Sequence, residues 1–142
     1  MIQFVAQKAF PHWNTLPITE RDVRRIARKR GAQIVEGKVG VLGLYIIYGG
    51  VPFIVIDPDL NGPMRLWVLL HELAHHLLHV PGLQLFDHRF ETKADSEANL
   101  LAAVAMIPRS WIETKSFADL LEEDYPRDLL WVRKEIFEQH GF

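Results

Sequence analysis

Strand-forming and helix-forming residues occupy separate stretches of this sequence, and this separation limits the possible folds more than any other feature. Three runs rich in β-branched and aromatic residues follow one another at 33–36, 39–48 and 51–56, and glycines divide them. Such runs predict a small antiparallel sheet. The segments before and after them show helical spacing of apolar residues. We therefore expect an α+β fold in which helices are in the majority.

Capping and stop signals place the expected helices on both sides of this stretch. A serine or threonine followed by an aspartate three residues later occurs at the start of three of them, which is typical of a helix N-terminus. Glycine or proline ends each segment. The expected helices are 19–31, 63–79, 92–108, 116–125 and 126–140.

Length and composition fit a single globular domain. The chain has 142 residues, of which 49% are hydrophobic and 24% charged. This is enough apolar material for one core, so we expect one domain over 1–142. The chain has no cysteine, which excludes disulfides, thiolate metal sites and cysteine nucleophiles and fits a reducing compartment. The first residues lack the layout of a signal peptide, so we expect a cytoplasmic protein.

The charge balance argues against two classes of partner. The formal net charge is −2, which gives no overall attraction to nucleic acid or anionic lipid. No apolar run approaches the roughly 18 residues that a membrane-spanning helix requires. We therefore expect neither direct nucleic-acid binding nor membrane insertion, while the oligomeric state stays open.

The segment His71-Glu72-Leu73-Ala74-His75 matches the pattern H-E-x-x-H inside the expected helix 63–79. Residues four apart lie on one face of a helix, so both imidazoles can reach one ion. Zinc held by two histidines and one carboxylate keeps a fourth position for water, whose pKa it lowers toward about 7. Glu72 would take the proton of that water as general base. The pattern predicts a zinc hydrolase with ligands His71 and His75 and catalytic Glu72.

A third ligand has to come from another element. His76 points about 100° away from His75 around the helix, and His79 lies about 12 Å along the axis from His71. The longer zinc-protease pattern requires a third histidine at the position of Pro81, so it is excluded. A carboxylate from the start of the next helix is therefore expected, and the candidates are Glu91, Asp95 and Glu97.

The run HELAHHLLH, followed by DSEANLLAAVAMIP, resembles the ImmA/IrrE-type zinc metallopeptidases, whose second motif reads roughly E-x-x-A-(N/D)-x-x-A-x-x-(L/M)-x-P. The resemblance covers about residues 20–110, the motif-bearing core, and leaves 111–142 as a helical C-terminal extension. It implies a zincin-like fold, in which the small sheet packs on the helix that carries H-E-x-x-H, and it implies Zn²⁺ as the cofactor.

Carried over residue by residue, the family's histidine ligands fall on His71 and His75, and its catalytic glutamate falls on Glu72. Asn99 resembles the position that often orients a ligand histidine, a supporting contact that fixes the tautomer and the plane of the ring. A polar residue on the solvent side of a helix is the other interpretation of Asn99.

The family's third ligand falls on Asp95, although glutamate is usual there. Aspartate is shorter by one methylene, so either its helix approaches the ion more closely or the ligand changes. Glu97 therefore stays open as the alternative third ligand. Thr92 and Asp95 also form a capping box, which would account for the aspartate without a metal.

The resemblance implies a regulatory endopeptidase. Such proteins in bacteria and mobile elements typically inactivate a partner transcriptional repressor of the helix-turn-helix type by cutting it. We therefore expect a zinc-dependent metalloendopeptidase that acts on a protein or peptide, such as a helix-turn-helix repressor. The alternative is a non-proteolytic, toxin-like or regulatory binding partner with a structural or vacant metal site. Tyr48, His88 and Arg89 are conceivable oxyanion stabilisers, and the spacing selects none of them.

Overall fold

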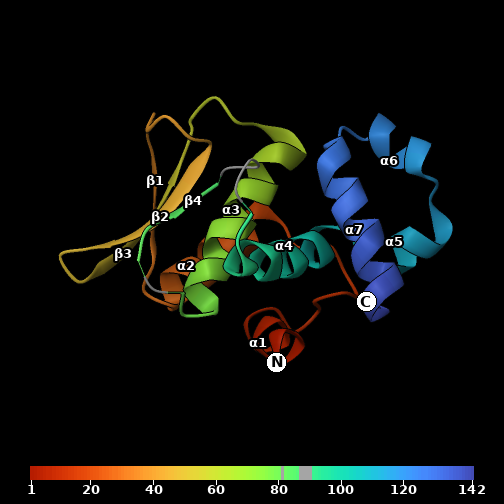
Figure 1. The fold of residues 1–142 in the computed structure, drawn as a ribbon, viewed down its shortest axis with the longest axis horizontal. Helices are drawn as coiled ribbons and strands as arrows, with labels where there is room; N and C mark the ends of the chain where they lie inside the picture. The colour runs from red at the N-terminus through yellow and green to blue at the C-terminus, as the bar shows by residue number, and fades with distance from the viewer. Residues whose placement is uncertain (81, 87–90) are drawn as a thin grey trace.

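The computed structural model describes residues 1–80, 82–86 and 91–142. Within these ranges the chain forms one small sheet and seven helices. The strands are β1 (Gln33–Glu36), β2 (Gly43–Tyr48), β3 (Val51–Ile56) and β4 (Gln84–Leu85). The helices are α1 (Ile2–Ala9), α2 (Glu20–Lys29), α3 (Gly62–Leu77), α4 (Lys93–Met106), α5 (Arg109–Thr114), α6 (Phe117–Glu122) and α7 (Arg127–His140). Figure 1 shows the sheet at one end, α5 to α7 at the other, and α3 and α4 between them.

The sheet has the order β1-β3-β2-β4. β2 and β3 form the expected antiparallel hairpin, and the left-handed φ values of Gly49 and Gly50 allow its tight turn. β4 is antiparallel to β2, but β1 runs parallel to β3. The α+β class and the zincin-like architecture are confirmed, whereas the expectation of a wholly antiparallel sheet is wrong for β1. The reason is that β3 lies between β1 and β2, an order that residue patterns do not encode.

α3 is the central helix of the fold. It packs most extensively against α4 and also contacts β2, β3 and α2. Every residue from Trp67 to His75 is buried, because neighbouring elements cover α3 on more than one side. The polar side chains of the H-E-x-x-H segment therefore lie in the interior, where each needs a partner or a function.

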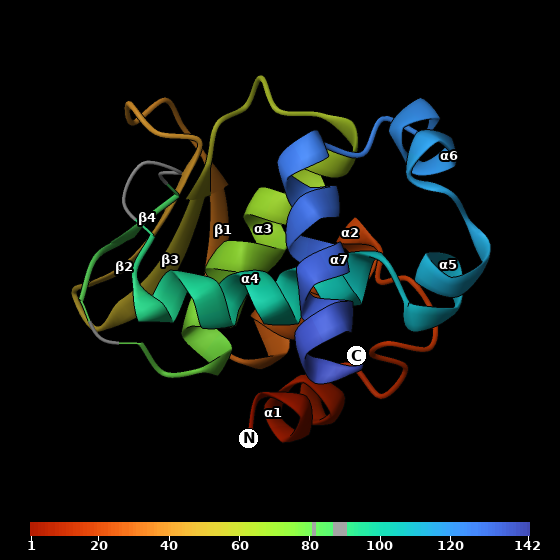
Figure 2. The ribbon, with the colours of Figure 1, turned by 45° about the vertical axis from the view of Figure 1, so that its right-hand side comes forward.

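α7 is held against the end of α4 by a buried arginine. Arg133 on α7 donates from Nε to the carbonyl oxygen of Ile107 at 2.6 Å and from Nη2 to Asn14 Oδ1 at 3.3 Å. Asn14 Oδ1 also accepts from the backbone N–H of Arg109. These contacts join three distant parts of the chain, and they fix the face that α7 turns toward α4 (Figure 2).

In the part of the chain that the structure describes, no helix is both long and apolar enough to cross a bilayer.

β2 begins unusually close to α3. A Cβ atom at Gly43 would lie 2.5 Å from Val68 Cγ1 and 3.4 Å from Glu72 Cγ. Only a residue without a side chain allows the backbone to pass at this distance. Gly43 therefore brings the first residue of β2 against the face of α3 that carries Glu72.

We expect Gly43→Ala to destabilise the fold, because the new methyl group overlaps Val68 and either β2 or α3 must shift. Overpacking of this kind costs about 1–3 kcal/mol, measurable as a lower midpoint of urea unfolding. Gly37→Ala is the matched control, since its Cβ would lie 3.6 Å from Val55 Cγ1, an ordinary contact. Equal midpoints for the two variants would contradict the close approach of β2.

Candidate metal centre

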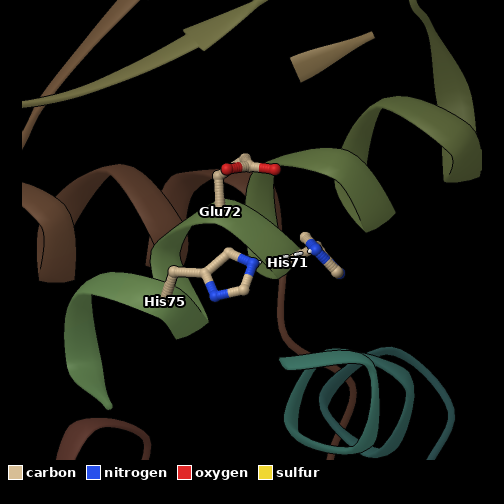
Figure 3. A group of neighbouring side chains, drawn as sticks. All are labelled: His71, Glu72 and His75. Atoms are coloured by element: carbon tan, nitrogen blue, oxygen red, sulfur yellow. Dashed lines mark hydrogen bonds between the residues drawn. The ribbon is translucent and has the colours of Figure 1, made fainter. Parts of the chain in front are cut away.

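Three potential ligand atoms meet between α3 and α4. The rings of His71 and His75 approach each other with their Nε2 atoms 3.1 Å apart (Figure 3). Asp95 Oδ1, from the first turn of α4, lies 3.3 Å from His71 Nε2 and 3.2 Å from His75 Nε2. All three side chains are buried, and Asp95 is only 8% exposed. The three atoms therefore form a nearly equilateral triangle inside the protein.

This triangle has the size that a tetrahedral metal ion requires. Zinc binds histidine nitrogen and carboxylate oxygen at about 2.0–2.2 Å, so neighbouring ligand atoms on a tetrahedron are roughly 3.3–3.6 Å apart. The distances between His71, His75 and Asp95 lie at or just below this range. Two imidazoles and one carboxylate are also the donor types of catalytic zinc sites. The residues present thus fit a zinc ion.

Asn99 determines which ring nitrogen of His71 carries the proton. Asn99 Nδ2 donates to Glu91 Oε1 at 3.2 Å, which leaves Asn99 Oδ1 to accept from His71 Nδ1 at 2.7 Å. With the proton on Nδ1, the lone pair of Nε2 points toward Asp95 Oδ1. Asn99 thus fixes the orientation of the His71 ring, with Nε2 directed at Asp95.

The protonation state of His75 depends mainly on burial rather than on a hydrogen bond from a neighbouring side chain. Burial, followed by the neighbouring charge of His71, lowers the pKa of His75 to about 4, so the ring is neutral at pH 7. Its Nδ1 is buried and has no hydrogen-bond partner among the described residues. A neutral imidazole offers a lone pair to a metal ion without first losing a proton.

Asp95 uses its two oxygens for two purposes. Oδ2 accepts from the backbone N–H and the hydroxyl of Thr92 at 3.1 and 2.9 Å, which completes the capping box of α4. Oδ1 is the atom that faces His71 and His75. Burial alone would raise the pKa of Asp95, but the contact with His71 and the hydrogen bonds from Thr92 hold it well below its usual value. The carboxylate is therefore negatively charged, as a ligand must be.

Glu72 is a buried carboxylate that no described residue satisfies. It is fully buried, and neither carboxyl oxygen has a hydrogen-bond partner in the described part of the chain. Burial, and after it the charge of Asp95, raises the pKa of Glu72 well above its usual value. Figure 3 shows it projecting from α3 away from the two rings, yet a carboxyl oxygen lies within 4.8 Å of a nitrogen of each histidine.

The alternative carboxylates do not face the two histidine rings. Glu97 is two positions after Asp95, about 200° around the helix, and lines a cleft between α1, α4 and α7. Glu91 is exposed and accepts hydrogen bonds from Ser96 and Asn99 rather than facing the two rings. The structure thus brings Asp95, and neither glutamate, to the two histidines.

His76 and His79 do not join the cluster. His79 is exposed, but His76 is half-buried and ties three elements together, a contact that the sequence did not reveal. Its Nε2 donates to the carbonyl oxygen of Arg30 at 2.8 Å, so its Nδ1 accepts from the Tyr45 hydroxyl, also at 2.8 Å. These partners are 46 and 31 residues away, and no local pattern could have identified them.

Of the candidate oxyanion stabilisers, Tyr48 ends β2 at the hairpin turn and is 74% exposed. His88 and Arg89 lie outside the described residues. The oxyanion position therefore stays without an assigned residue.

A cleft of about 290 Å³ opens beside the triangle. His71, Asp95 and Asn99 lie on one part of its wall, and α7 supplies another part that the sequence analysis did not connect with the site. The cleft gives at least one side of the candidate metal centre access to a second molecule.

Comparison with known proteins identifies the family. A family model described as the IrrE N-terminal-like domain (Peptidase_M78) matches residues 27–125, more than two thirds of the chain. No curated protein and no solved structure matches the chain. The matched range contains both histidines of the triangle, Glu72 and Asp95, and it ends before α7 begins. The chain therefore belongs to the IrrE N-terminal-like domain family of metallopeptidases.

Proposed function

We propose that this protein is a zinc-dependent endopeptidase that cleaves a protein partner, such as a helix-turn-helix transcriptional repressor. The observation that carries the proposal is the triangle of His71 Nε2, His75 Nε2 and Asp95 Oδ1. Beside it lies the carboxylate of Glu72, which has no hydrogen-bond partner in the described ranges. This arrangement supplies the three ligands and the base that peptide hydrolysis by zinc requires.

The side chains divide the work as follows. His71, His75 and Asp95 hold the ion, and Asn99 keeps the ring of His71 in its ligating tautomer. Zinc, when bound, polarises the scissile carbonyl and acidifies the attacking water. Glu72 accepts the proton of that water and later delivers it to the leaving amine.

The open side of the site favours catalysis over a structural role. Structural zinc sites have four protein ligands and no access, whereas catalytic sites keep one position for water or substrate. Here the cleft reaches two of the three proposed ligands, His71 and Asp95. A closed site would also have no use for the Glu72 carboxylate, which no described residue satisfies.

The edge of the sheet supports an extended peptide as the bound form of the substrate. β4 pairs only with Leu44 and Tyr45 of β2, so the described part of the chain provides no partner strand for 46–48 along that edge. Ile47, Leu83 and Leu85 are exposed apolar residues on these two strands and the segment leading into β4. Unpaired strand edges with apolar side chains bind peptides by adding a strand.

Metal removal and reloading test the proposal. The protein is stripped with a chelator, reloaded with one equivalent of zinc and incubated with the helix-turn-helix repressor encoded beside it. We expect fragments of that repressor, identified by mass spectrometry, with the loaded protein and none with the stripped protein. An intact repressor in the presence of protein that retains one zinc per chain would instead support the non-proteolytic binding partner.

A further inference from the structure

The cleft beside the candidate metal centre has an apolar part and an acidic part. Its apolar wall combines Trp67 of α3, Phe86 after β4 and Val132 of α7. The rings of Trp67 and Phe86 are packed edge to face with centroids 5.3 Å apart, and both are buried, so they form the floor of the cleft. The volume of about 290 Å³ equals roughly ten water molecules at about 30 Å³ each, which is room for one long side chain.

Two carboxylates, Asp128 and Glu91, give the same cleft a negative charge beyond the proposed ligands. Asp128 lies in the first turn of α7, is exposed, and has no hydrogen bond or ion pair with another described residue. Glu91 is held in place by hydrogen bonds from Ser96 and Asn99. No lysine or arginine lines this cleft in the described ranges of the chain.

Trp131 completes the wall on the α7 side. It is 55% exposed, which is unusual for so large an apolar side chain, and it lies one helical turn after Asp128. Phe117 packs on its ring with centroids 5.3 Å apart, and Lys134 Nζ lies 5.6 Å from the ring centroid. Lys134 lines a different cleft, between α5, α6 and α7, so it does not neutralise Asp128 within this one.

We propose that this cleft receives a lysine or arginine side chain of the substrate, next to the bond that is cut. The aliphatic stem would lie on Val132 and Trp131, above the buried rings of the cleft floor, and the cationic group would reach Asp128. An acidic residue is repelled there, and a large apolar one would desolvate Asp128 without giving it a partner. This proposal rests on the proposed function, because it names the residue that the same site selects.

The part of the cleft wall that α7 supplies lies outside the family match, whereas Trp67, Phe86 and Glu91 lie inside it. The family model ends at residue 125, while Asp128, Trp131 and Val132 follow on α7. The ligands and Glu72 lie inside the matched range. The structure therefore combines a shared catalytic centre with a specificity cleft completed by a separate segment.

The first arm of the test profiles cleavage. Zinc-loaded protein is incubated with a peptide library made by cutting a bacterial proteome after glutamate, so that lysine and arginine remain internal. We expect one position within two residues of the cut bond to be enriched in lysine and arginine. Asp128→Asn should lower that enrichment roughly fivefold, because it removes a partly exposed ion pair. Glu122→Gln, an exposed carboxylate of α6 outside the cleft, should leave the profile unchanged.

The second arm measures binding without cleavage. An acetylated alanine peptide with a single arginine, and its norleucine twin, are titrated by calorimetry into the zinc-loaded Glu72→Gln variant. We expect the arginine peptide to bind roughly fivefold more tightly, and Glu72→Gln/Asp128→Asn to remove the difference. Equal binding of the two peptides, or a basic preference that survives Asp128→Asn, would overturn the specificity cleft. If the arginine peptide bound selectively but no peptide were cleaved in the first arm, the specificity proposal would hold and the proposed endopeptidase activity would be wrong.

Discussion

Glu72→Gln is expected to abolish cleavage while zinc stays bound. Glutamine has the same size, but its amide cannot accept the proton of the attacking water, and loss of a general base typically costs about 10²–10⁴ in rate. The metal is retained because the three ligand atoms belong to other side chains. Folding is also expected to persist, since no described residue donates a hydrogen bond to the Glu72 carboxylate.

Three measurements on one preparation check this expectation: zinc per chain, the urea midpoint, and the rate at which repressor fragments appear. Glu97→Gln is the matched control, the same substitution on a glutamate that lines the cleft between α1, α4 and α7. It should leave all three values unchanged. Fragments released by Glu72→Gln at the wild-type rate would rule out Glu72 as the base, and loss of zinc in this variant would make Glu72 a ligand instead.

The part of the site that could be predicted from sequence is the part that local geometry determines. His71, Glu72 and His75 lie within one turn of one helix, so their relative positions follow from the helix itself once the turn signals at 57–63 and 81–82 bound it. The structure brings the two imidazoles together as this spacing implies.

The third carboxylate could not be decided in the same way. Asp95 and Glu97 face opposite sides of α4, and the choice between them depends on how α4 rotates against α3, which is a property of the packed core. The two interpretations of Asp95, capping residue and ligand, also looked exclusive, whereas the carboxylate serves the cap with Oδ2 and faces the histidines with Oδ1. Because a carboxylate has two oxygens, Asp95 can fill both positions at once, which a motif match does not indicate.

Contacts between distant segments could not be predicted from the sequence for the same reason. The parallel pairing of β1 with β3, the tie from His76 to Tyr45 and Arg30, and the position of α7 beside the cleft all depend on tertiary packing. None leaves a periodic pattern of apolar residues, which is the signal that sequence interpretation uses. The position of α7 matters most for function, because α7 supplies part of the proposed specificity cleft.

Asp95→Ala is expected to weaken zinc binding by more than about 100-fold. Removing a residue that only hydrogen-bonds to a ligand typically weakens metal binding by about 10–100-fold, so the loss of a ligand should exceed this. Without Oδ1, His71 and His75 are the only side chains of the triangle that remain. The same substitution removes Oδ2 from the capping box, which should lower the free energy of unfolding of the metal-free protein by about 0.3–1.5 kcal/mol. One variant thus shows two separate losses, one for each oxygen.

Asp22→Ala separates these losses, because Thr19 and Asp22 form the same threonine–aspartate capping box at the start of α2, away from the histidines. We expect a similar decrease in the free energy of unfolding and unchanged zinc affinity, measured by competition with a chromophoric chelator. Asp95→Asn adds a third comparison, since its amide oxygen can still accept from Thr92 while its neutral side chain ligates zinc poorly. If Asp95→Ala bound zinc as tightly as Asp22→Ala does, Asp95 would be a capping residue alone, and the triangle would lose its third ligand.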